Sequence, residues 1–241
     1  MSLPQGIALS AAALLLAGGA FAALAWARRG PEDRFPTALL RLLLHLYMGV
    51  WHRLRLSPCP AGEPIPRDGA AIVVANHRSG VDPLALACCT SRVIHFLMAR
   101  EYYETPGIGW ICRAVGAIPV NRDGNDLGAT KAALKALRAG SVIGIFPEGG
   151  IRVGESEEQA MAKSGVALLA LRSGATVVPA HIAGTPNYDS VLRAFLTPSR
   201  SRVRLGQALR FDLPDGRKPS REEMDLVAEQ ILERIRTLGE G

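Results

Sequence analysis

Short apolar runs alternate with amphipathic stretches over most of the chain, beginning near residue 70. Runs rich in Val, Ile and Ala are typical of buried strands, and they occur at Ala70–Ala75, Val93–Ala99, Ala114–Val120, Val142–Phe146 and Thr176–Ile182. Two shorter runs predict edge strands or a hairpin, at Val203–Leu205 and Ala208–Phe211. Helical spacing of apolar residues marks Pro83–Cys89, Asn125–Ala139, Gln159–Arg172 and Arg221–Leu238. This alternation predicts an α/β layered domain with a mostly parallel or mixed sheet flanked by helices.

A different pattern occupies residues 1–30. From Gly6 to Trp26 no side chain carries a formal charge, and Ala and Leu dominate. A helix of about 20 apolar residues spans a bilayer core, and Arg28 and Arg29 follow directly. The positive-inside rule then predicts a transmembrane anchor with the rest of the chain on the cytoplasmic side. A cleaved signal peptide is the alternative, because Ala25–Ala27 resembles a cleavage site, but basic residues are missing ahead of the run.

The next segment, residues 31–68, predicts a helix at the membrane surface followed by a linker. The Leu-rich stretch from Pro36 to Leu56 also carries Arg, His and Trp side chains. Such a helix can lie among lipid headgroups with its basic groups near the phosphates, or it can be an ordinary helix that covers the domain core. Four prolines from Pro58 to Pro66 indicate an extended linker. We therefore expect the main domain over residues 69–241, attached to the membrane by a single pass or at its surface.

Charge and composition narrow the expected partners. The net charge of +6 suits an anionic membrane surface, a phosphorylated substrate or nucleic acid. Nucleic acid is not expected, because only 5% of residues are aromatic and no basic stretch is interleaved with them. The four cysteines show neither CxxC pairing nor a histidine at metal-ligand spacing, so we expect no metal site and no disulfide: Cys59, Cys88, Cys89 and Cys112.

A histidine and an aspartate follow the first predicted strand of the main domain. His77 comes just past Ala70–Ala75, and Asp82 follows five residues later, after a turn that contains Gly80. A turn of this size can bring the carboxylate back to the imidazole, so that Asp82 holds one ring nitrogen and the other accepts a proton. A hydroxyl that attacks a thioester, for example, needs such a base, because the pKa of the hydroxyl lies far above neutrality. Asp82 before Pro83 also fits a helix N-cap, and the two roles are compatible.

Glycines and charged residues follow two further predicted strands and open the next helix. In chain order they are Arg122, Glu148, Gly149, Arg152 and Lys163. Glycine permits close approach of the backbone to a ligand, and guanidinium groups bind phosphate through paired hydrogen bonds. Because the ends of parallel strands meet at one edge of a sheet, we expect a phosphate site near His77. Glu148 could orient the glycerol group of an acceptor molecule, or it could pair with an arginine.

Four segments in this order resemble the glycerolipid acyltransferase family, which includes the 1-acylglycerol-3-phosphate acyltransferases. They are the HxxxxD pair His77 and Asp82, GAIPVNR ending at Arg122, FPEGGIR ending at Arg152, and VPAHI over residues 178–182. The resemblance implies transfer of an acyl group from acyl-CoA or acyl-carrier protein to the sn-2 hydroxyl of lysophosphatidate, without a cofactor. It also implies that His77 is the base, that Asp82 is its partner and that the arginines bind the acceptor phosphate. Gly150 stands where the family usually has threonine, so a hydroxyl that could contact the acceptor is missing.

Three other functions stay open at this point. The protein could acylate another lysolipid, such as a lyso-ornithine lipid, or it could be a non-catalytic lipid-binding protein of the membrane. A hydrolase is disfavoured, because the chain has no GxSxG nucleophile elbow. The expected partners are a lysophospholipid acceptor, an acyl donor and membrane lipids, and the sequence does not distinguish acyl-CoA from acyl-carrier protein.

Overall fold

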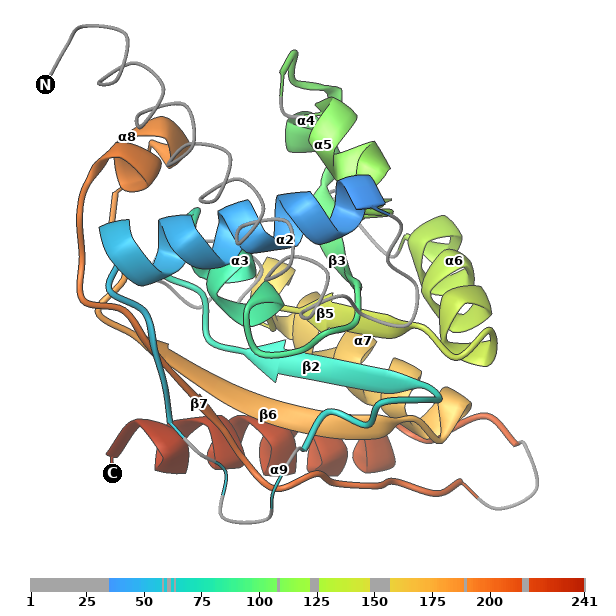
Figure 1. Ribbon diagram of the computed structural model, residues 1–241. Coiled ribbons are helices and arrows are strands. Elements are labelled where there is room, and N and C mark those ends of the chain that lie inside the picture. Colours follow the sequence, from blue (N-terminus) through green and yellow to red (C-terminus); the bar gives the residue numbers. More distant parts are fainter. Residues whose placement is uncertain are drawn as a thin grey trace, which may run out of the picture.

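Seven strands form one sheet in the computed structural model of the protein, which describes residues 35–57, 59, 62, 64–107, 109–121, 126–147, 157–188, 190–213 and 217–240 (Figure 1). In chain order the strands are β1 (Arg55–Ser57), β2 (Ala71–Ala75), β3 (Ile94–Ala99), β4 (Ile118–Val120), β5 (Val142–Ile145), β6 (Thr176–Ala183) and β7 (Arg202–Leu205). Across the sheet their order is β1-β7-β6-β2-β5-β3-β4. The β6–β7 pair is antiparallel and the other neighbours are parallel, so the predicted mixed sheet is confirmed.

Helices cover both faces of this sheet. One face carries α2 (Phe35–Leu46), the π-helical turn η1 (Tyr47–Trp51) and α3 (Asp82–Ala87), and the other carries α6 (Leu127–Arg138), α7 (Glu157–Ser173) and α9 (Arg221–Glu240) (Figure 1). The central strand β2 serves both layers, because successive side chains of a strand point to opposite faces. Val73 and Ala75 join the core under α2 and α3, whereas Ile72 and Val74 join the core under α6, α7 and α9. All residues of β2 are fully buried, as a central parallel strand requires.

Three short helices lie in connections where the sequence analysis predicts none. They are α4 (Arg100–Glu104), α5 (Gly109–Ala114) and α8 (Val191–Leu196), and each is too short to show a helical period. The strand expected over Ala114–Val120 is wrong in its first part, because Ala114 ends α5 and pairing with β3 begins at Ile118. The strand expected over Ala208–Phe211 is reduced to one bridge between Leu209 and Val177. β7 lies between β1 and β6 rather than at an edge.

The helix expected over Pro36–Leu56 ends early. α2 stops at Leu46, η1 continues to Trp51, and the chain then enters β1 beside β7. Met48 is fully buried in the core under this layer, so the segment packs onto the sheet as a covering helix does. Its outer side still exposes apolar side chains, including Leu43 and Val50. The folded core therefore includes residues that precede the linker.

The predicted transmembrane segment, Gly6–Trp26, lies outside the residues that the structure describes. Within the described ranges, no helix combines the length and the apolar character that crossing a bilayer requires. The anchor and its orientation therefore stay predictions from the sequence.

Candidate active site

The loop after β2 brings His77 and Asp82 into contact. Nδ1 of His77 lies 3.0 Å from Oδ2 of Asp82. The same carboxylate oxygen accepts hydrogen bonds from the backbone N–H groups of Arg78 at 2.7 Å and Ser79 at 2.8 Å. The loop thus folds around the carboxylate, and it does so at the sheet edge where the parallel strands β2, β5 and β6 all end.

Asp82 is the fixed member of this pair. Its side chain is fully buried, whereas 16% of the His77 side chain is exposed. Moving the carboxylate would leave two backbone donors without partners, which costs free energy in a buried site. The N-cap role expected for Asp82 is wrong: α3 begins at Asp82 itself, Val81 holds the N-cap position, and no side chain caps the helix. The carboxylate turns back to the loop instead of to the helix.

Two phenylalanines support the His77 ring. The ring stacks on Phe146 with centroids 4.1 Å apart and planes inclined by 19°, and Phe146 stacks on Phe96 with centroids 5.8 Å apart. Phe146 directly follows β5 and Phe96 lies in β3, so three neighbouring parts of the sheet build one column of rings. Because Phe96 belongs to the core under α2 and α3, His77 lies on that face of the sheet.

Asn76 holds the chain just before His77. Its side chain is buried, its Nδ2 donates to the carbonyl oxygen of Ile182 at 2.8 Å, and its Oδ1 accepts from the N–H of Ile182 at 2.7 Å. These two bonds extend the hydrogen bonding between β2 and β6 past Ala75, the last residue of β2 that pairs with β6. Neither the bonds of Asn76 nor the ring stack could be predicted from the sequence, because both depend on partners from strands distant along the chain.

The remaining predicted site residues are not brought to this pair by the described contacts. Lys163 lies in α7 with a half-buried side chain, and within the described ranges it makes no hydrogen bond or ion pair. Four others fall outside the described residues: Arg122, Glu148, Gly149 and Arg152. Their roles stay predictions. In the sequence the last three come directly after Phe146 and Pro147, and Phe146 is the residue that stacks on His77.

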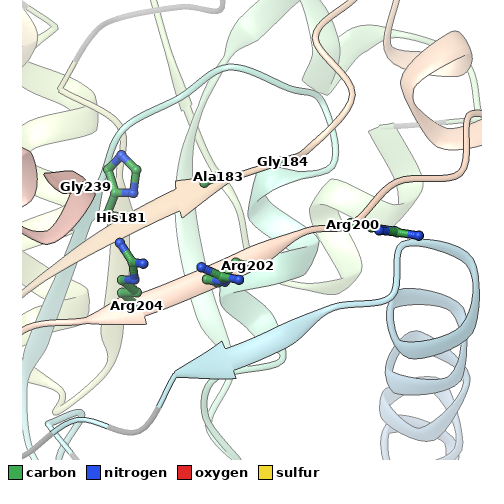
Figure 2. Close-up of a pocket in the computed structure, with 7 residues that line it drawn as sticks. All are labelled: His181, Ala183, Gly184, Arg200, Arg202, Arg204 and Gly239. Carbon is green, nitrogen blue, oxygen red and sulfur yellow. The ribbon is translucent and has the colours of Figure 1, made fainter. Parts of the chain in front are cut away.

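A second polar cluster lies at the same end of the sheet (Figure 2). A pocket of about 300 Å³ is lined by His181, Ala183, Gly184, Arg200, Arg202, Arg204 and Gly239. Burial, together with the charges of Arg204 and Arg78, lowers the pKa of His181. A signal for this cluster is present in the sequence, because Arg200, Arg202 and Arg204 alternate with the period of a strand.

A family model matches the part of the chain that carries this fold and site. Residues 59–183, slightly more than half of the chain, match the family model described as Acyltransferase. The chain belongs to the acyltransferase family. The matched segment runs from before β2 to the end of β6, so it contains His77, Asp82 and the strands that position them.

Three curated relatives show the range of proteins that this family member resembles. An uncharacterized protein of Mycobacterium tuberculosis is 32% identical over 170 residues, which cover 65% of this chain and 44% of that protein, so the chain spans less than half of the relative. The 1-acyl-sn-glycerol-3-phosphate acyltransferase of Bacillus subtilis is 24% identical over 177 residues, or 73% of this chain and 84% of that protein. The lyso-ornithine lipid O-acyltransferase of Rhodobacter capsulatus is 36% identical over 89 residues, or 36% of this chain and 31% of that protein.

A solved structure shares the fold. The 1-acyl-sn-glycerophosphate acyltransferase PlsC of Thermotoga maritima superposes with a TM-score of 0.59, covering 93% of this chain and 88% of that chain. The sequence identity of 22% is low, so the likeness concerns the arrangement of the backbone.

Proposed function

We propose that the protein is a 1-acylglycerol-3-phosphate O-acyltransferase, which moves a fatty acyl group from a thioester donor to the sn-2 hydroxyl of lysophosphatidate and so makes phosphatidate. The observation that carries this proposal is the His77–Asp82 pair, joined at 3.0 Å at the sheet edge of an acyltransferase family member. The name of the Bacillus subtilis relative, a 1-acyl-sn-glycerol-3-phosphate acyltransferase, supports the choice of acceptor.

In the proposed reaction His77 is the general base. Its Nε2 takes the proton of the acceptor hydroxyl while the hydroxyl oxygen attacks the carbonyl carbon of the thioester. The carbon–sulfur bond breaks, and the leaving thiolate takes the proton back from the imidazolium. Asp82 holds Nδ1–H and offsets the positive charge that forms on the ring. No covalent acyl-enzyme is required when donor and acceptor bind together.

The acceptor site is assigned to the residues implied by the family resemblance. We assign Arg122 and Arg152 to the acceptor phosphate, with Lys163 as a further cation, and Glu148 and Gly149 to the surrounding loop. No cofactor takes part, and acyl-CoA or acyl-carrier protein serves as co-substrate.

We also place the protein at the membrane, since both acceptor and product are lipids. Exposed apolar side chains of α2–η1 and α8 support contact with a bilayer: Leu40, Leu43, Val50, Trp51, Leu192 and Leu196. The anchor over residues 1–30 and the cytoplasmic orientation of the catalytic domain belong to the same proposal. That domain covers residues 69–241, and β1 from before the linker completes its sheet.

The His77→Ala variant tests the proposed base. Purified wild-type protein, given a panel of lysolipids with acyl-CoA or acyl-carrier protein donors, is expected to make phosphatidate from lysophosphatidate. The variant should lose about 10³-fold in kcat, since a positioned general base contributes about 10²–10⁴-fold. His95→Ala is the matched control, because it removes an imidazole that bonds to the carbonyl of Gly116 away from this loop. Retained acyl transfer in His77→Ala would contradict the assignment, and an inactive wild type would favour a lipid-binding protein.

A second candidate acceptor is a lyso-ornithine lipid, which carries no phosphate. The Rhodobacter capsulatus relative, a lyso-ornithine lipid O-acyltransferase, favours this acceptor. Arg122→Ala and Arg152→Ala separate the two candidates. A raised KM for lysophosphatidate supports phosphate recognition, whereas an unchanged KM together with acylation of the lyso-ornithine lipid supports the second candidate.

A further inference from the structure

The basic pocket, formed around His181, Arg200, Arg202 and Arg204, lies beside the end of α9 (Figure 2). His181 alternates along β6 with residues that pack under α2 and α3, so it points to the opposite face of the sheet from His77. Gly239 of α9 also lines the pocket. The volume of about 300 Å³ reaches the lower end of the range of small-molecule sites.

Strand pairing gathers the arginines of this pocket around His181. β6 and β7 run antiparallel, and His181 stands directly opposite Arg204. Figure 2 shows Arg202 and Arg204 on β7, as expected for residues two apart on one face, and Arg200 on the segment that leads into the strand. β1 then places Arg55 beside Arg202 on the next strand. Four arginines and a histidine therefore stand at neighbouring positions on one face.

This grouping of like charges is not neutralised by the described part of the chain. Cations directly opposite each other across a strand pair repel and destabilise the sheet. Within the described ranges, none of the four arginines forms an ion pair with a carboxylate. Arg204 instead donates to the carbonyl oxygen of Leu238 at 2.9 Å, near the negative end of α9. Such an arrangement suits an anionic ligand that neutralises the cluster when it binds.

The pocket is lined by Gly239 of α9 and by basic side chains that include His181 of β6 and Arg204 of β7. The elements α2, η1 and α8 lie on one side of the sheet, and α9 lies on the other (Figure 1). The first three carry exposed apolar residues such as Leu43, Val50 and Leu196. A bilayer that faced α2 would lie across the sheet from α9, which favours a soluble ligand for the α9 side of the pocket. The pocket is nevertheless linked to the His77 loop, because Arg78, the next residue, contributes to the positive charge around His181.

We propose that the basic pocket binds the phosphate groups of a soluble acyl donor, a coenzyme A thioester, and this inference rests on the proposed acyl transfer. Coenzyme A carries its phosphates at the end of a long, flexible pantetheine arm, opposite the thioester. The phosphates can thus bind on the α9 face while the acyl carbonyl reaches His77 around the sheet edge. Guanidinium groups match phosphate oxygens in paired, charge-assisted hydrogen bonds.

A double variant tests this site in the full-length protein. Arg200→Gln with Arg202→Gln removes two exposed cations and leaves the Arg204 contact to α9 intact. Arg138→Gln with Arg172→Gln is the matched control, because it removes two exposed arginines of α6 and α7 and changes the net charge equally. Titration with coenzyme A should give a Kd raised about tenfold or more in the pocket variant alone, since charge-assisted bonds are lost. Pantetheine, which has no phosphate, should bind all proteins alike.

Three outcomes would overturn the proposal. The first is equal affinity of both double variants for coenzyme A. The second is unchanged coenzyme A affinity with reduced binding to phosphatidylglycerol vesicles relative to phosphatidylcholine vesicles, which would make a lipid headgroup the ligand. The third is a kinetic defect confined to acyl-carrier protein donors. The titration measures binding without turnover. An inactive wild type would therefore contradict the proposed acyl transfer, whereas the affinities for coenzyme A would still test the pocket.

Discussion

At the scale of single residues, Gly144 determines how closely the rings behind His77 can pack. A Cβ atom at this position of β5 would lie 2.4 Å from the ring of Phe96, which is closer than atoms can approach. Phe96 stacks on Phe146, and Phe146 stacks on His77. The missing side chain of one strand residue therefore leaves the space in which the imidazole is held.

We expect Gly144→Ala to displace Phe96 and, through Phe146, the His77 ring. Overpacking of this kind lowers the free energy of unfolding by about 1–3 kcal/mol, and kcat should fall as well because the base is misplaced. Urea denaturation and steady-state kinetics measure the two effects. Gly165→Ala in α7 is the control, since no atom lies within 4 Å of its added Cβ. It should stabilise by about 0.5–1 kcal/mol. A normal kcat in Gly144→Ala would show that the ring stack does not position His77.

At the scale of elements, buried His52 joins η1 to the segment after α8. Its Nε2 lies 2.9 Å from the hydroxyl of Tyr47, and its Nδ1 lies 2.8 Å from Oγ of Ser199. The Tyr47 hydroxyl in turn donates to the carbonyl oxygen of Phe195 at 2.6 Å. Burial lowers the pKa of His52, so folding favours the neutral ring.

This shift predicts that stability falls as the pH is lowered below about 7. Unfolded His52 gains its proton near an ordinary pKa of about 6.5, whereas folded His52 gains it only at lower pH. Between the two pKa values the unfolded chain binds more protons, so the free energy of unfolding declines by at most about 1.4 kcal/mol per pH unit for this group. Below the folded-state pKa both states bind the proton, so His52 no longer contributes to the dependence of the free energy of unfolding on pH.

Urea denaturation across this pH range, with His52→Gln as the comparison, measures the effect. Glutamine can still bond to Tyr47 and Ser199 but does not titrate, so its stability should depend less on pH. An identical pH dependence in the two proteins would contradict the role of His52.

Elements with a long or strongly apolar pattern could be predicted from the sequence, and short ones could not. The helix predicted over Arg221–Leu238 is observed as α9 over Arg221–Glu240, because many turns repeat one amphipathic period. β1 has three residues and pairs with β7 from the other end of the chain, so no local pattern indicates it. The Leu-rich pattern of α2 continues past Leu46, and the predicted helix was too long for that reason.

The same distinction applies to the candidate site. His77 and Asp82 lie at the two ends of one short turn, so their spacing in the sequence already indicates that their side chains can meet. The contact of His77 with Phe146 and the gathering of arginines around His181 depend on the register between strands. Register is set by packing of the whole sheet, and local patterns do not contain it.

At the scale of the whole molecule, two surfaces of different chemistry lie on opposite sides of the sheet. Apolar side chains are exposed along α2–η1 and α8, and the basic pocket is lined in part by Gly239 of α9. Figure 1 shows α2 and α9 on opposite sides of the sheet. Clustered exposed apolar groups of this kind mark sites of contact with membranes or other proteins. In the proposed reaction the lipid acceptor would arrive on the first side and the soluble donor on the second.

We expect Val50→Asp with Leu196→Asp to impair the use of lysophosphatidate embedded in vesicles. Each side chain loses about 1.5–3 kcal/mol of apolar burial when it no longer enters a lipid surface, so kcat/KM on vesicles should fall about tenfold or more. With acceptor in detergent micelles the activity should stay within about twofold. Leu226→Asp on the opposite side, in α9, is the matched control for an exposed leucine. An equal loss in Leu226→Asp, or an equal loss in micelles, would refute a membrane role for this surface.

The pairing of β1 with β7 also bears on the order in which the protein is made. During synthesis Arg55–Ser57 leave the ribosome before every other strand, yet their neighbour Arg202–Leu205 is among the last strand residues to follow. Until then β1 has no partner, and contacts between residues so far apart in the chain form slowly. Closure of the sheet at this edge is thus a late event, and it is the event that sets Arg55 beside Arg202. The nascent chain would hold the His77 loop well before it could complete the cluster of cations.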